Sequence, residues 1–180
     1  FLGVAQVTAP DNLFAWQSRS NFLPLVTAGQ RPLFAGAKET LRAVAADDFQ
    51  PRREVYLPTS ARAEVRATNI SDARIVAPQW AAQRARFSVA AATPAMVVIA
   101  QSFYHNWRAF VDGHPVRLWR ANHAFQALEV PAGRHEVTLV YQDRAFHLGA
   151  IVSALTLITC LVLLKRGDGS RRTYHENPRQ

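Results

Sequence analysis

The sequence contains little cysteine and little charge: among 180 residues it has one cysteine, Cys160, and 19% charged residues. A single cysteine excludes an intrachain disulfide framework and any metal or iron–sulfur site built from several cysteines. Because 49% of the residues are apolar, the chain can bury a core, and intrinsic disorder is excluded as well. The length fits one domain, or two small ones.

Short catalytic motifs are absent too. There is no glycine-rich phosphate loop, no His-Glu-x-x-His, no Gly-x-Ser-x-Gly and no Walker lysine. His105, His114, His123 and His135 are nine, nine and twelve residues apart, which is not the spacing of a compact metal site. We therefore expect no catalytic residue, no metal and no cofactor in this chain.

Phe1–Pro10 has no basic segment before an apolar stretch, so we do not expect these residues to be a signal peptide. The chain begins at Phe1 rather than Met, and we expect it to be part of a longer protein. The net charge of +8 comes from basic residues scattered singly, without the interleaved aromatic residues of a nucleic-acid groove. Nucleic acid is therefore not an expected partner, and the charge suits anionic lipid headgroups or a solvated surface.

One long apolar run lies near the C-terminus. Residues 148–164 contain no charge and no proline, and residues 145–164 make a helix of about 30 Å, the thickness of the bilayer hydrocarbon. The alternative is a buried helix of a soluble core. The basic residues that follow directly, Lys165 and Arg166, favour a membrane span whose C-terminal tail is cytoplasmic and whose preceding residues lie outside.

The rest of the chain has the pattern of a β protein. The only convincing soluble helix is Lys38–Ala46, where apolar residues recur at helical spacing. The predicted strands are Phe1–Ala9, Phe22–Ala28, Arg53–Pro58, Ala61–Ile70, Ala73–Trp80, Arg84–Ala92, Pro94–Tyr104, the two arms of a hairpin around Asp112-Gly113, Ala124–Val130 and Arg134–Tyr141.

Short strands with turn signals every 8–12 residues are typical of a β-sandwich. The predicted fold class is mainly β: an antiparallel β-sandwich with a short α/β N-terminal segment, followed by one C-terminal transmembrane α-helix. The expected divisions are an N-terminal segment (1–58), an extracytoplasmic sandwich (59–144), a transmembrane helix (145–164) and a cytoplasmic basic tail (165–180). Because the last strand leads almost directly into the span, we expect the sandwich close to the bilayer.

An ordered series of residues accompanies this pattern. It comprises Trp107, Ala109, Val111, Asp112 and Gly113, then Ala121, Asn122 and Phe125, then Val130, Pro131, Gly133, His135, Val137 and Tyr141, and closes at Gly149 and Ser153. The series resembles the C-terminal region of the YfhO family of bacterial multi-pass membrane proteins, and Asp47–Pro58 resembles the family's preceding segment. His105-Asn106 stand where the family usually has Pro-Gly, which indicates a divergent branch.

The resemblance implies a glycosyltransferase-like protein of the bacterial cytoplasmic membrane, acting on cell-envelope glycans with lipid-linked sugar donors. The family's catalytic acidic residue is expected in an early extracytoplasmic loop, upstream of this chain, so we expect these residues to be catalytically inert. Asp112 is a conceivable acid, but beside Gly113 its simpler role is to accept hydrogen bonds within a turn. The implied partners are the lipid bilayer, the parent protein's other membrane helices, and a lipid-linked sugar or envelope glycan.

Aromatic and basic residues gather around the predicted hairpin. Aromatic rings stack on sugar faces and arginine pairs with phosphate, so the candidate contacts for a glycan or lipid phosphate are Tyr104, Trp107, Arg108, Arg117 and Trp119. The alternative is that Trp107 fills the core and Trp119 rests at the membrane interface. Two functions thus stay open: an accessory domain of a membrane glycosyltransferase, or a structural or protein-interaction module without a ligand.

Overall fold

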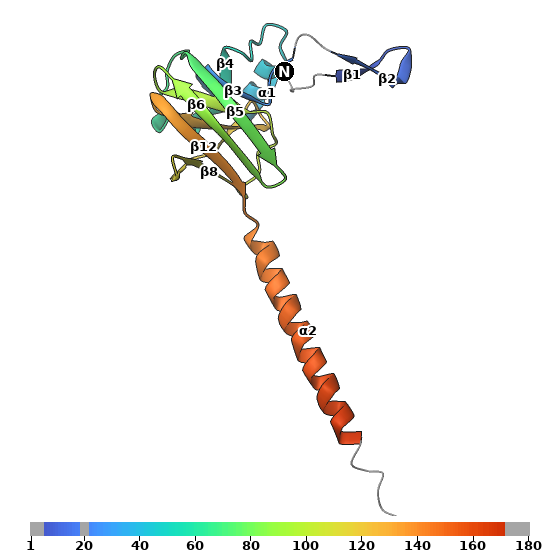
Figure 1. Ribbon diagram of the computed structural model, residues 1–180. Coiled ribbons are helices and arrows are strands. Elements are labelled where there is room, and N and C mark those ends of the chain that lie inside the picture. The colour runs from blue at the N-terminus through green and yellow to red at the C-terminus, as the bar shows by residue number, and fades with distance from the viewer. Residues whose placement is uncertain (1–5, 19–21, 172–180) are drawn as a thin grey trace, which may run out of the picture. The chain divides into compact units, whose positions relative to one another are not determined.

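The computed structural model describes residues 6–18 and 22–171, and it is mainly β with one apolar helix at the C-terminal end (Figure 1). The contacts divide the chain into a β unit that ends at Gln142 and a helical unit that begins at Asp143. The predictions of a mainly β fold and of a C-terminal apolar helix are confirmed.

The β unit contains two five-stranded sheets. The first sheet has the order β10 (Trp119–Ala121), β11 (Phe125–Val130), β7 (Ala95–Ile99), β3 (Val26–Ala35) and β4 (Glu54–Pro58); the second has the order β5 (Ala73–Ala81), β6 (Arg84–Ala91), β12 (Gly133–Tyr141), β8 (Trp107–Val111) and β9 (His114–Val116). Figure 1 shows β5, β6, β12 and β8 of the second sheet side by side.

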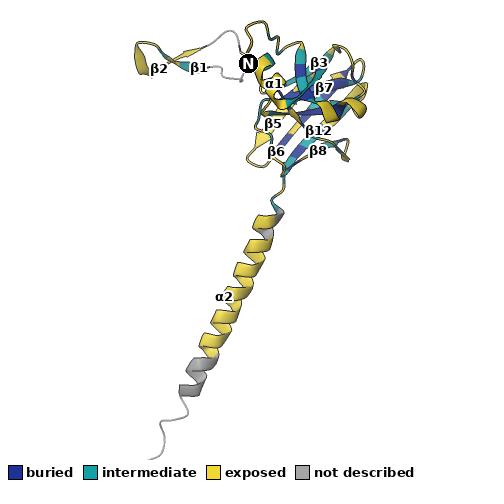
Figure 2. Ribbon diagram, turned by 180° about the vertical axis from the view of Figure 1, so that it is seen from behind, coloured by how far each residue is buried: buried dark blue, intermediate teal, exposed yellow. Residues whose placement is uncertain are grey.

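Two apolar clusters form the core. The larger one contains residues of both sheets, including Phe87 in β6, Val97 in β7 and Leu139 in β12, so the sheets pack face to face. The smaller one lies on the other side of the first sheet and includes Leu57 in β4 and Met96 in β7. Figure 2 shows this burial on the strands. In β7 all five residues are buried because it contributes to both clusters.

The first sheet nearly closes on itself. Its edge strands are β10 and β4, yet Asn122, directly after β10, donates its backbone N–H to the Tyr56 carbonyl of β4 at 2.9 Å. The Asn122 side-chain Oδ1 accepts the Tyr56 N–H at 2.8 Å. Because a sheet edge exposes unpaired backbone groups, these two bonds remove part of both edges, and the sheet wraps around the smaller cluster.

The helix α1 (Ala37–Ala45) connects β3 to β4, which pair in parallel. Glu39 accepts the Gly36 N–H at 3.1 Å and so caps the first turn. The prediction of a helix over Lys38–Ala46 is confirmed. The prediction of an antiparallel sandwich is wrong for one pair of strands, because β3 and β4 run parallel and α1 is the crossover that a parallel pair needs. β3 and β4, from the predicted segment 1–58, therefore share a sheet with strands from the segment 59–144.

Most strand predictions are confirmed within a few residues, but one predicted segment is not a strand. Ala61–Ile70, predicted as a strand from its alternation, contains the 3-10 helix η1 (Thr59–Ala63) and then irregular backbone. The physical reason is a side chain: the Glu129 carboxylate accepts the backbone N–H groups of Arg66 and Ala67 at 2.8 and 2.5 Å. These groups are satisfied without a neighbouring strand.

The N-terminal part forms a hairpin of β1 (Gln6–Ala9) and β2 (Asn12–Ser18). Residues 1–5 of the predicted strand Phe1–Ala9 lie outside the described residues. The strand predicted from Phe22 begins only at Val26, after Pro24. Proline has no N–H to donate to a neighbouring strand, so it is mostly found in edge strands, at the start of a strand or in bulges.

The helical unit consists of α2 (Arg144–Arg171). Its window Leu148–Lys165 has a mean hydropathy of 2.2, and its side chains are exposed. An unburied apolar helix of this length is suited to lipid rather than to water. The helix continues past the predicted span 145–164, and residues 172–180 of the predicted tail lie outside the described residues.

Candidate functional site

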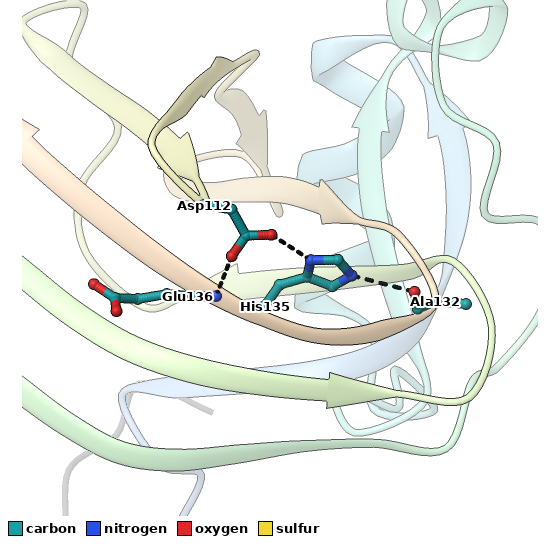
Figure 3. A network of polar contacts seen from close by, with 4 residues as sticks. All are labelled: Asp112, Ala132, His135 and Glu136. Carbon is teal, nitrogen blue, oxygen red and sulfur yellow. Dashed lines mark hydrogen bonds and ion pairs between the residues drawn. The ribbon is translucent and has the colours of Figure 1, made fainter.

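The most organised polar site among the described residues is a carboxylate–imidazole pair. Nδ1 of His135, at the start of β12, lies 2.6 Å from Oδ2 of Asp112, in the turn after β8 (Figure 3). The other ring nitrogen, Nε2, lies 3.2 Å from the carbonyl oxygen of Ala132. His135 is largely covered, with 18% of its side chain exposed, whereas Asp112 is half-exposed.

The pair exists because two turns meet at the same end of the second sheet. Asp112 and Gly113 have φ values of 51° and 81°, the left-handed pair that a type I′ hairpin turn requires. The Asp112 N–H donates to the Glu136 carbonyl at 2.9 Å, and Oδ1 of Asp112 accepts the Glu136 N–H at 2.8 Å. The β8–β9 turn is thereby fastened to β12.

The second turn, which contains Gly133, lies next to the His135 ring. Gly133 has φ = 122°, and a Cβ at that position would lie 3.2 Å from Nε2 of His135. Glycine thus supplies both the backbone conformation and the space that the ring needs. Gly133 thus allows the turn that begins at Val130-Pro131 to bring the His135 ring back over its own backbone.

The contacts shift both pKa values in the direction that strengthens the pair. The hydrogen bond to Asp112, and then that to the Ala132 carbonyl, raise the pKa of His135 above its ordinary value of 6.5. The hydrogen bond to His135, followed by that to the Glu136 N–H, lowers the pKa of Asp112 below 3.8. Both ring nitrogens face acceptors, so the doubly protonated imidazolium satisfies both of them.

This arrangement positions backbone rather than reactants. Both oxygens of Asp112 are occupied by its contacts to His135 and Glu136, and both nitrogens of His135 face acceptors of the same two turns. Within the part of the chain that the structure describes, no group of three His, Cys, Asp or Glu side chains is placed to hold a metal ion. Locking two turns together is the role that the geometry supports for Asp112.

The five predicted contact residues do not form one surface. Trp107 is 8% exposed and belongs to the larger cluster, with its ring edge-on to Tyr141 at 5.4 Å between centroids. Trp119 is 6% exposed and belongs to the smaller cluster. Trp107 thus lies in the core, as the alternative interpretation expected, and the two indoles belong to two different clusters.

The other three side chains are exposed. Tyr104 is 49% exposed and lies parallel to Tyr141, with 6.3 Å between the ring centroids. Arg108 is exposed in β8. Arg117 covers the Trp119 ring, with its guanidinium carbon 4.2 Å from the ring centroid, and pairs with Glu64 at 2.6 Å.

The separation follows from a change of sheet. The predicted hairpin arm ran from His114 to Trp119, but β9 ends at Val116, and Trp119 begins β10 in the other sheet. The sequence contains no turn signal at Arg117-Leu118, so the crossing was missed. The partnership of His135 with Asp112 was missed as well, although both lie in the ordered series and flank adjacent strand ends.

The family model described as bacterial membrane protein YfhO matches residues 85–153, from β6 to the first part of α2. No curated protein matches the chain. The matched segment, less than half of the chain, contains Asp112, Asn122 and His135 together with the beginning of the apolar window of α2.

Proposed function

From the match to the YfhO family over residues 85–153, we propose that this chain is the C-terminal part of a YfhO-like bacterial membrane protein. In this proposal it is an accessory, non-catalytic part of a glycosyltransferase that acts on cell-envelope glycans with lipid-linked sugar donors. The observation that carries the proposal is that the matched segment runs without interruption from the strands of the β unit into an apolar helix suited to a bilayer.

The proposed topology places α2 across the bacterial cytoplasmic membrane, with the β unit outside and the C-terminus inside. Lys165 and Arg166 directly follow the uncharged run, and basic residues are retained on the cytoplasmic side. The partners are then the bilayer and the parent protein's other membrane helices.

Topology is tested with a cysteine introduced by Asn69→Cys, at an exposed position, in a Cys160→Ser background. A membrane-impermeant maleimide is expected to label this variant in intact cells. Labelling only after the cells are permeabilised contradicts the proposed sidedness.

An accessory rather than catalytic role is supported by what the residues of the ordered series do. Asp112, Asn122 and His135 hold turns and strand edges through the contacts described above. For the sugar contact we keep the exposed members of the predicted set, Tyr104, Arg108 and Arg117, because an exposed ring can stack on a sugar and a guanidinium can pair with phosphate.

The sugar contact is tested in the parent protein. Tyr104→Ala and Arg108→Ala are expected to reduce glycan transfer while the amount of protein in the membrane stays unchanged. Trp107 is unsuitable for this test because its truncation opens the core. Arg84→Ala, an exposed arginine in β6, is the matched control. Normal transfer by abundant Tyr104 and Arg108 variants contradicts the proposed contact.

A structural or protein-interaction module without a ligand is the second candidate, and one observation favours it. The β1–β2 hairpin exposes Leu13, Phe14 and Trp16 at 76%, 94% and 68%, and an isolated two-stranded hairpin with such a face needs a partner. Under this alternative, Phe14→Ser and Trp16→Ser reduce assembly of the parent protein, whereas Tyr104→Ala leaves transfer unchanged.

A further inference from the structure

A groove of about 680 Å³ lies along β3 and β5, one strand from each sheet. Its lining includes Leu25, Gln30, Arg52, Arg74, Ile75 and Trp80. None of these residues is among the five predicted contacts for a glycan or lipid phosphate around the Asp112-Gly113 hairpin. All of them precede residue 85 and thus lie outside the segment matched by the family model.

Both strands that line the groove are interrupted by a β-bulge. In β3 the register shifts between Ala28 and Gln30, and in β5 it shifts between Val76 and Gln79. Ala77, inside the second bulge, has φ = 49°, a conformation that residues other than glycine rarely adopt. Bulges bend strands and redirect side chains next to binding sites, and strained backbone is retained where it serves a site.

Gln30 supplies a buried acceptor in the lining. The residue is 1% exposed, and its Nε2 donates to the Thr27 hydroxyl at 2.5 Å and to the Pro51 carbonyl at 3.3 Å. Its Oε1 is buried and has no hydrogen-bond donor among the described residues. A buried acceptor without a donor is unfavourable, and a hydroxyl or an N–H of a molecule bound in the groove would supply the donor that Oε1 of Gln30 lacks.

The remaining lining combines apolar and cationic groups. Trp80 and Leu25 are each 40% exposed, which leaves part of an indole free beside the groove. Arg52 and Arg74 are also exposed, and Arg74 has only a distant carboxylate, Asp72, at 4.0 Å. Among the described lining residues none is acidic, so the groove carries positive charge and suits an anion.

We propose that this groove binds a carbohydrate that carries a carboxylate or phosphate group. The apolar face of a sugar packs on Trp80, a hydroxyl donates to Oε1 of Gln30, and the anionic group lies between Arg52 and Arg74. The choice of a carbohydrate rests on the proposed function, whereas the anionic and hydroxyl-bearing character follows from the lining.

Other occupants fit the lining less well. A fatty acyl chain has no donor for Oε1 of Gln30. A peptide added as a strand along β5 needs a regular edge, and β5 has a bulge and Pro78 there, two features that prevent strand addition.

Binding is measured by titration calorimetry on the whole chain in phosphatidylcholine nanodiscs. The probe is trigalacturonate, a trisaccharide with a carboxylate on each ring, compared with maltotriose, which is neutral, and with dodecyl phosphate. We expect trigalacturonate to bind at least tenfold more tightly than maltotriose, and its affinity to fall as salt is raised.

Variants assign the binding to the groove. Trp80→Ala and the double variant Arg52→Gln/Arg74→Gln are each expected to weaken trigalacturonate binding about tenfold, and the double variant also removes most of the salt dependence. Trp16→Ala, an exposed tryptophan in β2, and Arg53→Gln, the exposed neighbour of Arg52, are matched controls with unchanged affinity. Gln30→Met is expected to weaken binding about tenfold too, with near-UV circular dichroism checking its fold.

Absence of trigalacturonate binding, unchanged binding by the Trp80 or arginine variants, or preference for maltotriose or dodecyl phosphate overturns the proposal. These outcomes are independent of glycan transfer. Loss of transfer in the Tyr104 and Arg108 variants of the parent protein concerns the proposed function alone, and the binding assay requires no transfer activity.

Discussion

The two sheets of the β unit deal with their edges in different ways. In the first sheet, the side chain and backbone of Asn122 join the last residues of β10 to β4, so the edges meet. In the second sheet, β5 stays at the edge and is interrupted by a bulge and by Pro78. One sheet gains closure from a buried polar residue, and the other keeps an irregular edge beside which a groove opens.

The two buried tryptophans, Trp107 and Trp119, offer the largest test of this comparison. Trp107→Ala removes a core residue shared by both sheets, and Trp119→Ala removes one enclosed by the first sheet alone. Each is expected to lower the free energy of unfolding by about 3–5 kcal/mol, because both indoles are buried. Urea unfolding of the chain in nanodiscs, followed by circular dichroism, measures this change.

The control is Trp80→Ala, whose partly exposed side chain should change the free energy of unfolding by less than about 1 kcal/mol. The milder variants Trp107→Phe and Trp119→Phe are expected to act additively, because the residues belong to separate clusters. A strong interaction between them, or a loss below about 1 kcal/mol in the alanine variants, contradicts the division into two clusters.

Gly29 tests where the two sheets meet. A Cβ at this residue of β3 would overlap the backbone carbonyl oxygen of Ser71, and its φ of 93° disfavours any side chain. Gly29→Ala is therefore expected to lower the free energy of unfolding by about 3 kcal/mol or more. Gly113→Ala is the matched control: its φ is also positive, but no atom lies within 4 Å, so a loss of about 1–2 kcal/mol is expected. Equal losses would rule out the close backbone approach.

Asn122 tests the closure of the first sheet. Asn122→Gly keeps the left-handed conformation of this residue, whose φ is 46°, but removes the acceptor of the Tyr56 N–H. We expect a loss of about 1–3 kcal/mol, since a partly buried donor is left without its partner. Faster hydrogen exchange at the Tyr56 amide is the specific measurement. Asn69→Gly, at an exposed position, should leave that amide unchanged, and protection retained in Asn122→Gly would contradict the closure.

His135 gives the smallest expected effect, on the second sheet. Its pKa is raised in the folded state, so its contribution to stability is complete below about pH 6.5 and is lost as pH rises through the raised value. The pKa of Asp112 is lowered, so its contribution is present above about pH 4 and is lost on acidification below that. The pair is therefore strongest between about pH 4 and 6.5.

Between pH 6 and pH 8 the melting temperature of the β unit is expected to fall by a few degrees. His135→Gln should remove this part of the pH dependence, and His105→Gln, at an exposed position, should leave it in place. A wild-type profile identical to that of His135→Gln would show that the pair does not contribute.

Local signals in the sequence predicted much of this fold. Asp112-Gly113 predicted a hairpin turn, and the spacing of Leu41 and Val44 predicted a helix. The uncharged run after His147 predicted a candidate membrane span. These features depend on neighbours within a few residues, which is why one sequence sufficed. The alternation over Ala61–Ile70 failed as a strand signal because Glu129, distant in sequence, satisfies its backbone.

The candidate sites were harder to predict because they depend on which sheet each strand joins. Trp107 and Trp119 are twelve residues apart, and only the crossing after β9 separates them into two clusters. The groove needs two bulges on strands from different sheets, together with an unpaired buried amide oxygen on Gln30. None of these relations has a local sequence signature.

The bond between Tyr56 and Asn122 joins residues 66 positions apart, and this sets the order of events during synthesis. High contact order slows folding, because distant strands must find one another before their pairing is rewarded. The ribosome has translated most of the β unit before β10 can close the first sheet. Only two residues then separate β12 from α2, so the last strand of the β unit and the start of the apolar helix are translated one directly after the other.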